Sequence, residues 1–233
     1  HATSSRVQDV SDDMAARILA DNLGRGLSRM GESHTKGLGY MADAGDAAGL
    51  TTAYKEAKNA IQHQAGIEKA VVRSASVLWT DVTAGQKKTA TFEPLIDARA
   101  GSLLNEVKAA YQLQAAQRAV AAAEPLMTAE EKEAASLIVE AVPPPPGAGP
   151  GGGFGGGGRG PATGPSLPDE FNAELGLLIP KKLSVLQIRD FLSGEFTPLP
   201  VADVLAVLRA REKAGSVKIT PKPADPKATP KRK

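Results

Sequence analysis

The chain has 233 residues, with 28 Lys and Arg against 26 Asp and Glu, and it contains no cysteine. This length allows one or two domains, and the lack of cysteine excludes a disulfide framework and a thiolate zinc site. No apolar run is long enough for a transmembrane helix. Aromatic residues make up only 4% of the chain, and alanine supplies much of the apolar content. We therefore expect helices that pack closely but bury little area per contact, with modest stability or stabilisation by a partner.

The first residues predict a short helix followed by a loop. The chain begins with His1 rather than with methionine, and we expect processing or truncation to explain this start. Ser11 is a good N-cap, and the apolar side chains that follow it predict a helix up to about Leu23. Gly24 is expected to loosen its end. The five glycines between residues 31 and 49 predict a loop with short helical turns at most.

Two long helical patterns come next. Apolar residues at steps of three and four predict a helix over residues 51–79, and a polar turn around Gly85 is expected to follow it. A second long helix is predicted from Pro94 or Leu95 to Glu124. Two long helices joined by a short turn pack antiparallel. The pattern therefore predicts a mainly α fold, either an antiparallel helical hairpin or a three- to four-helix bundle.

A third helix completes the first predicted domain. Thr128 and Glu131 have the spacing of a capping box, which opens a helix to about Val142. We expect this helix to pack onto the two long ones, and no β pattern competes with this interpretation. The first domain is accordingly predicted to be an Ala-rich helical bundle over residues 1–142.

A linker and a small unit are predicted after the bundle. Nineteen of the 26 residues in 143–168 are Pro or Gly, so this segment cannot bury enough surface to form a core. Residues 169–220 predict a small helical adaptor unit that folds back onto the bundle. Within it Ser184 and Gln187 form a second capping box, a further helix ends at Gly215, and a short strand-like end follows.

The last 13 residues predict a basic disordered tail. Residues 221–233 carry five basic side chains and one aspartate, whereas the whole chain has a formal net charge of only +2. The body is therefore net acidic, unlike a nucleic-acid-binding surface. The tail could still bind phosphate without sequence preference, and residues 184–214 have helix–turn–helix-like spacing. Nucleic-acid association through the tail is one alternative function.

The sequence shows no complete catalytic constellation. The histidines are His1, His34 and His63, and none has a partner histidine three or four residues away. No serine lies in a Gly-x-Ser-x-Gly elbow. The glycine-rich run at residues 151–155 lacks the Lys-Ser/Thr and the preceding strand of a P-loop. We assign no catalytic and no cofactor-binding residue, and this chain alone is expected to be non-catalytic and to hold no cofactor.

A resemblance suggests where the chain comes from. Residues 1–14, HATSSRVQDVSDDM, resemble the end of the catalytic domain in secreted bacterial two-zinc aminopeptidases, where a zinc-binding His precedes a Thr, a polar run with an Asp, a Val and a helix. Several such peptidases carry Ala-rich helical C-terminal extensions. Ala2 separates His1 from Thr3, and Ser5 or Arg6 replaces the expected early aspartate. The resemblance covers about 20 residues, and it implies that His1 is a candidate zinc ligand only if a companion chain supplies the other ligands.

The leading hypothesis is a non-catalytic helical accessory or scaffold segment. It would associate with a larger protein partner or with other copies of itself, and the resemblance makes it the processed C-terminal part of a peptidase-like protein. A secreted or periplasmic location follows from the same resemblance. The alternative enzyme hypothesis is a fragment that contributes His1 to a zinc exopeptidase site, with zinc bound only in the larger assembly.

Overall fold

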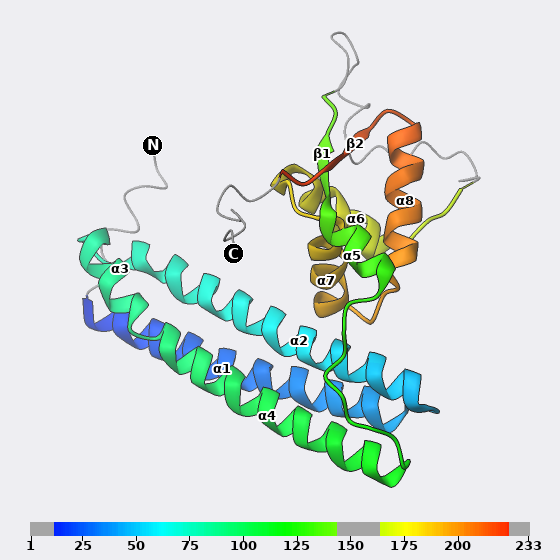
Figure 1. Cartoon of the computed structure of the whole chain (residues 1–233). Coiled ribbons are helices and arrows are strands. Elements are labelled where there is room, and N and C mark those ends of the chain that lie inside the picture. Colours follow the sequence, from blue (N-terminus) through cyan, green and yellow to red (C-terminus); the bar gives the residue numbers. More distant parts are fainter. Residues whose placement is uncertain (1–11, 144–163, 224–233) are drawn as a thin grey trace, which may run out of the picture. The chain divides into compact units, whose positions relative to one another are not determined.

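The computed structural model describes residues 12–143 and 164–223 and shows a mainly α protein. Its residues divide into two compact units, His1–Pro125 and Leu126–Lys233, which we call the N-terminal and C-terminal units. Figure 1 shows long helices in the first unit, and short helices with a two-stranded sheet in the second. The predicted fold class is confirmed. His1, most of the Pro/Gly-rich segment and the end of the basic tail lie outside the described residues.

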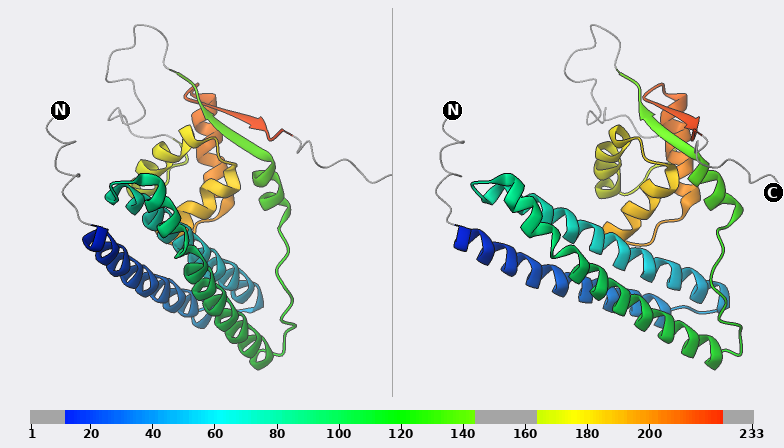
Figure 2. Two further views of the ribbon diagram at one scale, coloured as in Figure 1. Left: turned by 90° about the vertical axis from the view of Figure 1, so that its left-hand side faces the viewer. Right: turned by 60° about the vertical axis from the view of Figure 1, so that its left-hand side comes forward.

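The N-terminal unit is a bundle of three long helices with a short helix at one end. Its elements are α1 (Asp12–Ala42), α2 (Ala47–Ser74), the 3-10 turn η2 (Ala75–Leu78), α3 (Val82–Ala90) and α4 (Glu93–Gln117). The three long helices lie side by side in every view (Figure 2), and α1 packs against both α2 and α4. Asp46 caps α2 by accepting a 2.7 Å hydrogen bond from the Gly49 amide. This cap starts α2 directly after the short connection of residues 43–46.

Helix α1 is much longer than predicted, because an 11-residue repeat continues through its glycines. Its buried residues form two series with that spacing: Ala15, Gly26, Gly37 and Leu19, Met30, Met41. Eleven residues make three helical turns at about 3.67 residues per turn, so each series stays on one face. The predicted helix end at Gly24 is therefore wrong, and the loop predicted over residues 31–49 is limited to residues 43–46, between α1 and α2. Two of the glycines are needed for close packing, and they do not mark a loop.

Gly85 also serves packing, and the predicted polar turn around it is helix α3. Asp81 caps this helix through hydrogen bonds of 2.8 and 3.2 Å from the amides of Thr83 and Ala84. A Cβ atom on Gly85 would lie only 2.4 Å from the carbonyl oxygen of Ser76. The lack of a side chain therefore allows α3 to pack directly on the backbone of η2.

Helix α4 ends at Gln117, seven residues before the predicted end. Ala119 adopts a left-handed conformation with φ of 54°, and the Val120 amide donates a 3.0 Å hydrogen bond to the Ala115 carbonyl. This six-to-one bond is typical of a Schellman motif, which stops a helix and redirects the chain. The segment after it is held by the Tyr111 hydroxyl, which donates to the Ala123 carbonyl at 3.2 Å.

Two stacked tyrosines join α2 to α4 in the bundle core. The rings of Tyr54 and Tyr111 lie 4.3 Å apart and almost parallel, and the Tyr54 hydroxyl donates to a Glu124 carboxylate oxygen at 3.3 Å. Burial, together with the nearby negative charge of Glu124, raises the pKa of Tyr54 to about 12.

This pKa predicts a late step in an alkaline titration. Above the ordinary tyrosine pKa of 10.0 the unfolded chain loses the Tyr54 proton, whereas the folded chain keeps it up to about 12. The stability that Tyr54 contributes is thus complete below pH 10 and is lost as the pH rises towards 12. Tyrosinate absorbance should show a late-ionising tyrosine that is absent from the Tyr54→Phe variant. Persistence of the late step in that variant would contradict the assignment.

In its described residues, the C-terminal unit combines four short helices with one antiparallel strand pair. Its elements are α5 (Ala129–Ser136), β1 (Leu137–Ala141), α6 (Asp169–Leu178), the 3-10 turn η3 (Ile179–Lys181), α7 (Val185–Glu195), α8 (Val201–Lys213) and β2 (Val217–Pro221). Val139 of β1 pairs with Ile219 of β2 at the centre of the sheet. Both predicted capping boxes are present, at Thr128 with Glu131 and at Ser184 with Gln187.

The helix predicted from Thr128 to Val142 ends at Ser136, and its residues belong to the C-terminal unit rather than to the bundle. After Ser136 the run Leu137, Ile138 and Val139 forms β1, because these residues can pair with β2 and pack on the C-terminal core. Ala134 and Val139 are fully buried in that core. The compact units therefore divide after Pro125 rather than after residue 142. The Pro/Gly-rich segment joins β1 to α6 within one unit, so its predicted place between two domains is corrected.

Candidate functional site

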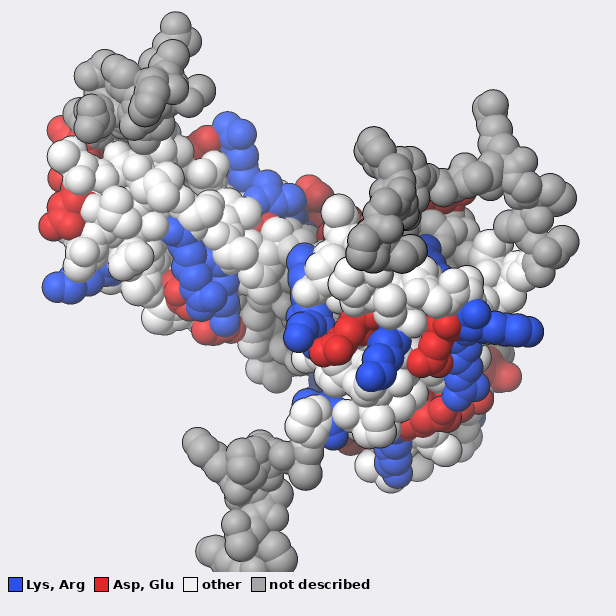
Figure 3. All heavy atoms as spheres, turned by 90° about the horizontal axis from the view of Figure 1, so that it is seen from above, with Lys and Arg blue, Asp and Glu red and all other residues white. Residues whose placement is uncertain are grey.

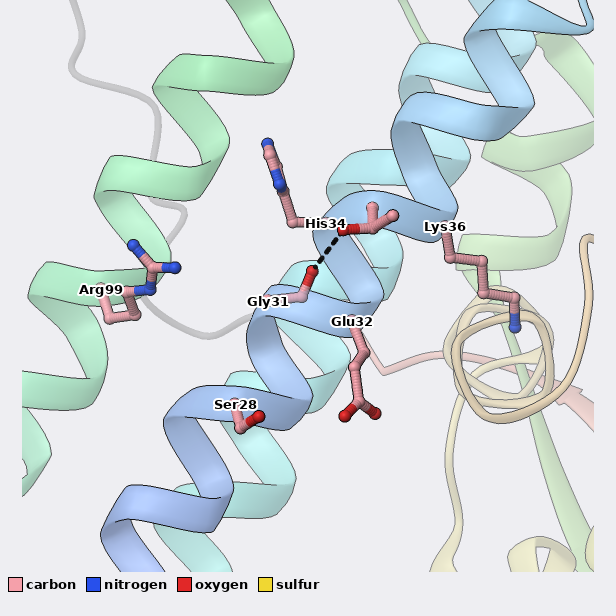
Figure 4. A pocket seen from close by; sticks show the side chains of 7 residues that line it. Ser28, Gly31, Glu32, His34, Lys36 and Arg99 are labelled. Atoms are coloured by element: carbon pink, nitrogen blue, oxygen red, sulfur yellow. Dashed lines mark hydrogen bonds between the residues drawn. The ribbon is translucent and has the colours of Figure 1, made fainter.

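One shallow polar groove lies on the N-terminal unit between α1 and α4 (Figure 4). It is lined by Ser28, Gly31, Glu32, His34, Thr35, Lys36 and Arg99. All but one of these residues come from α1, and Arg99 comes from α4. The groove brings a histidine, a serine and charged side chains together.

The histidine of this groove lies next to a carboxylate of α4. His34 is mostly buried, and its Nε2 lies 3.4 Å from a carboxylate oxygen of Glu106. This distance fits an ion pair, but the angle is not that of a hydrogen bond, since the same buried nitrogen makes none among the described residues. The imidazole therefore lies beside Glu106 at the interface between α1 and α4.

The groove contains no nucleophile with an activating base. Figure 4 shows the His34 ring turned towards α4, while Glu32 and Lys36 project from α1 in other directions. The Thr35 hydroxyl donates to the Gly31 carbonyl at 3.1 Å, a bond within its own helix. A nucleophilic site needs a hydroxyl and a base in hydrogen-bond reach of each other. None of the hydrogen bonds found within the groove joins a hydroxyl to a base.

The most buried carboxylate of the bundle serves packing. Glu68 of α2 is 2% exposed, and Arg29 of α1 donates two hydrogen bonds to it, at 2.8 and 2.7 Å. Gln64 donates to the same carboxylate. A Cβ atom on Gly26 would lie 2.4 Å from a Glu68 oxygen, so this glycine makes room for the pair. The network ties α1 to α2 and leaves the carboxylate enclosed.

The described residues hold no group of three or more His, Cys, Asp or Glu side chains suited to a metal ion. His34 and His63 both lie in the described part, on α1 and α2. His1, the one metal ligand proposed from the sequence, lies outside it, so that proposal stays a prediction. Within residues 12–143 and 164–223, no helix combines the length and the apolar character that crossing a membrane requires.

Helices α7 and α8 have the order of a helix–turn–helix, but α5 packs against both of them. Arg209 of α8 pairs with Glu133 of α5. Arg211 donates to Asn172 at 3.2 Å, and burial lowers its pKa. A recognition helix needs exposed base-reading side chains. The first exposed positions of α8 are Ala202, Asp203 and Ala206.

The charge distribution of the C-terminal unit also differs from that of a nucleic-acid-binding surface. Figure 3 shows its basic and acidic side chains interspersed on the face displayed. A surface that binds the phosphate backbone concentrates positive charge. The described part of α8 therefore does not have the features of a nucleic-acid interface. Most of the basic tail lies outside the described residues, and binding through it stays a prediction.

The sequence carries a signal for the position of His34 but none for its proximity to Arg99 or Glu106. The 11-residue repeat of α1 could have placed His34 on a long helix, whereas nothing in the sequence joins Arg99 or Glu106 to it. No protein-family model matches this chain, and neither a curated protein nor a solved structure is significantly similar to it.

Proposed function

We propose that this chain is a non-catalytic helical accessory or scaffold segment that associates with a larger protein partner. The sequence resemblance favours the catalytic part of a two-zinc aminopeptidase-like protein as that partner. The proposal does not depend on whether the partner is a separate polypeptide or is continuous with residue 1.

The observation that carries the proposal is an apolar end of the bundle. Met14, Ile18, Val77 and Val82 are large apolar side chains that are between 37% and 57% exposed. They belong to the start of α1, to η2 and to the start of α3, which lie together at one end of the bundle (Figures 1 and 2). Lys88 of α3 reaches Asp12 of α1 at 3.3 Å across this end. Several exposed apolar residues in one place favour a protein contact.

The position of this apolar end supports the choice of partner. Met14 and Ile18 follow directly on residues 1–11, and there the resemblance places the end of a catalytic domain. A larger folded partner attached or bound through residues 1–11 would lie next to these side chains. Glu68 and His34 favour the non-catalytic part of the proposal, since both are engaged in contacts between helices.

Intact-mass measurement and N-terminal sequencing of native material test the proposal directly. We expect the chain to co-purify with a larger polypeptide that has acidic and histidine metal ligands, or to be continuous with such a polypeptide upstream of His1. Metal analysis and an aminopeptidase assay of the intact assembly then identify the partner's class. Native material that runs as a stable monomer and binds nothing would overturn the proposal.

The contact itself is tested with a double variant. Ile18→Ser together with Val82→Ser should weaken binding to the isolated partner about tenfold or more, since each change removes roughly 1 kcal/mol of apolar burial. Leu177→Ser is the control, because Leu177 is also a large exposed apolar residue but lies in the C-terminal unit. Equal binding by both variants would place the contact elsewhere.

A further inference from the structure

The outward face of α4 carries no charged side chain along the whole helix. Its exposed residues on this face are Leu95, Ala98, Ser102, Asn105, Ala109, Gln112, Leu113 and Ala116. At about 100° per residue they fall within a stripe about 100° wide, opposite the buried positions Ile96, Leu103 and Val107. We call this set the α4 stripe. The exposed side of α1, by contrast, carries Arg17, Asp21, Arg25, Glu32 and Lys36.

Charged residues border the α4 stripe on both sides, and each border holds one acid and one base. Arg99 and Glu106 lie along one border, and Asp97 and Lys108 lie along the other. The midpoint of both pairs falls at the same place, between Ser102 and Leu103. Such an arrangement is self-complementary when the helix is turned end over end about that midpoint.

We propose that the α4 stripe is the contact surface for a second copy of this chain, packed antiparallel about a two-fold axis between Ser102 and Leu103. A two-fold axis keeps each border beside the same border of the other copy. Arg99 then faces Glu106 of the second copy, and Asp97 faces Lys108 of the second copy. Each contact occurs twice, so the dimer contains four opposite-charge pairs and no like-charge pair among these residues.

The uncharged residues fit the same register. With this axis, Ala98 lies at a position along the helix axis between Asn105 and Ala109 of the second copy. Ser102 lies beside its own symmetry mate. The stripe residues of the two helices therefore interleave, as side-chain ridges do when helices pack. Ala98, Ser102 and Ala109 are small, and this allows the two helices to approach closely.

The bordering side chains are available for these contacts. Arg99 and Lys108 are both exposed, and Figure 4 shows Arg99 at the edge of the groove on α4. Glu106 and Asp97 contact His34 and Lys69, but both carboxylates are about half exposed. A carboxylate has about four acceptor sites and can serve a second cation.

The size of the α4 stripe predicts a weak dimer. A helix of 25 residues is about 37 Å long, and a contact about 10 Å wide along it buries on the order of 800 Å² over both copies. Stable interfaces bury about 1,200–2,000 Å², so dissociation in the micromolar range or weaker is expected. This surface differs from the apolar bundle end, so either proposal can fail while the other holds.

Charge reversal tests the pairing by sedimentation equilibrium of the full chain. Arg99→Glu alone and Glu106→Arg alone should each raise the dimer dissociation constant about tenfold, because each puts like charges opposite each other twice. The double variant should restore the original value. Arg25→Glu, the same charge change on exposed α1, should leave it unchanged. The proposal is overturned by a wild-type chain that stays monomeric up to millimolar concentration, or by a double variant that dimerises no better than the singles.

Cysteine cross-linking tests the antiparallel register, and the natural chain contains no cysteine to interfere. Ser102→Cys should form a disulfide-linked dimer, because the two sulfurs would lie about one residue apart along the axis. Leu113→Cys should not, because its symmetry mate would lie 21 residues away, or about 31 Å. Cross-linking at both positions would show a parallel pair and overturn the register.

Discussion

Replacing Gly37 with alanine is expected to lower the free energy of unfolding by about 1 to 3 kcal/mol, because α1 and α2 are too close there for a side chain. A Cβ atom on Gly37 would lie 2.6 Å from the Cβ of Ala57 and 2.9 Å from its Cα. The second of these atoms is backbone, so it cannot move aside without shifting helix α2. The strain should exceed the roughly 1 kcal/mol that alanine normally adds to a helix interior.

Gly39→Ala is the matched control, two residues further along the same helix. A Cβ atom there meets nothing within 4 Å. This variant should raise the free energy of unfolding by about 0.5 to 1 kcal/mol. Urea unfolding followed by the fluorescence of Trp79, the single tryptophan and a buried residue of this bundle, measures both changes. Effects of the same sign at both positions would contradict the close contact at Gly37.

Removing the charge of Arg29 is expected to destabilise the bundle by about 2 to 4 kcal/mol, since the substitution leaves a buried carboxylate without its cation. Arg29→Met keeps most of the apolar stem but loses both hydrogen bonds to Glu68. Glu68 is 2% exposed and cannot recover solvation without opening the α1–α2 interface. The same unfolding measurement at neutral pH reports the loss.

Two further variants separate this effect from a general effect of charge. Arg25→Met removes an arginine from an exposed i,i+4 pair with Asp21 and should change stability by less than about 0.5 kcal/mol. Arg29→Met combined with Glu68→Leu should be more stable than Arg29→Met alone, because no buried charge is then left unpaired. If the double variant is the less stable one, the cost lies in lost packing.

Local signals in the sequence correctly predicted where two of the helices begin. The capping boxes at Thr128 and Ser184 start α5 and α7 as predicted, because a side chain bonded to a nearby backbone amide needs no distant contact. The long helix predicted over residues 51–79 corresponds to α2 and η2. Its apolar residues recur at ordinary helical spacing, which is visible in one segment.

The predicted secondary structure is wrong at glycines whose role depends on a neighbouring helix. Gly26, Gly37 and Gly85 resemble helix breakers when the chain is read alone, since glycine lowers helix propensity. In the structure they lie where Glu68, Ala57 and Ser76 leave no space for a Cβ atom. The 11-residue spacing of Leu19, Met30 and Met41 is the one signal in the sequence that marks α1 as continuous.

The sequence by itself determined that the chain is mainly helical and that its long helices pack against each other. Only the tertiary structure decided that residues 137–141 form a strand, because their partner β2 lies about 80 residues away in the chain. It also decided the division after Pro125 and the meeting of His34 with Glu106. These features depend on contacts between residues far apart in sequence, and neither helix periodicity nor capping carries information about such contacts.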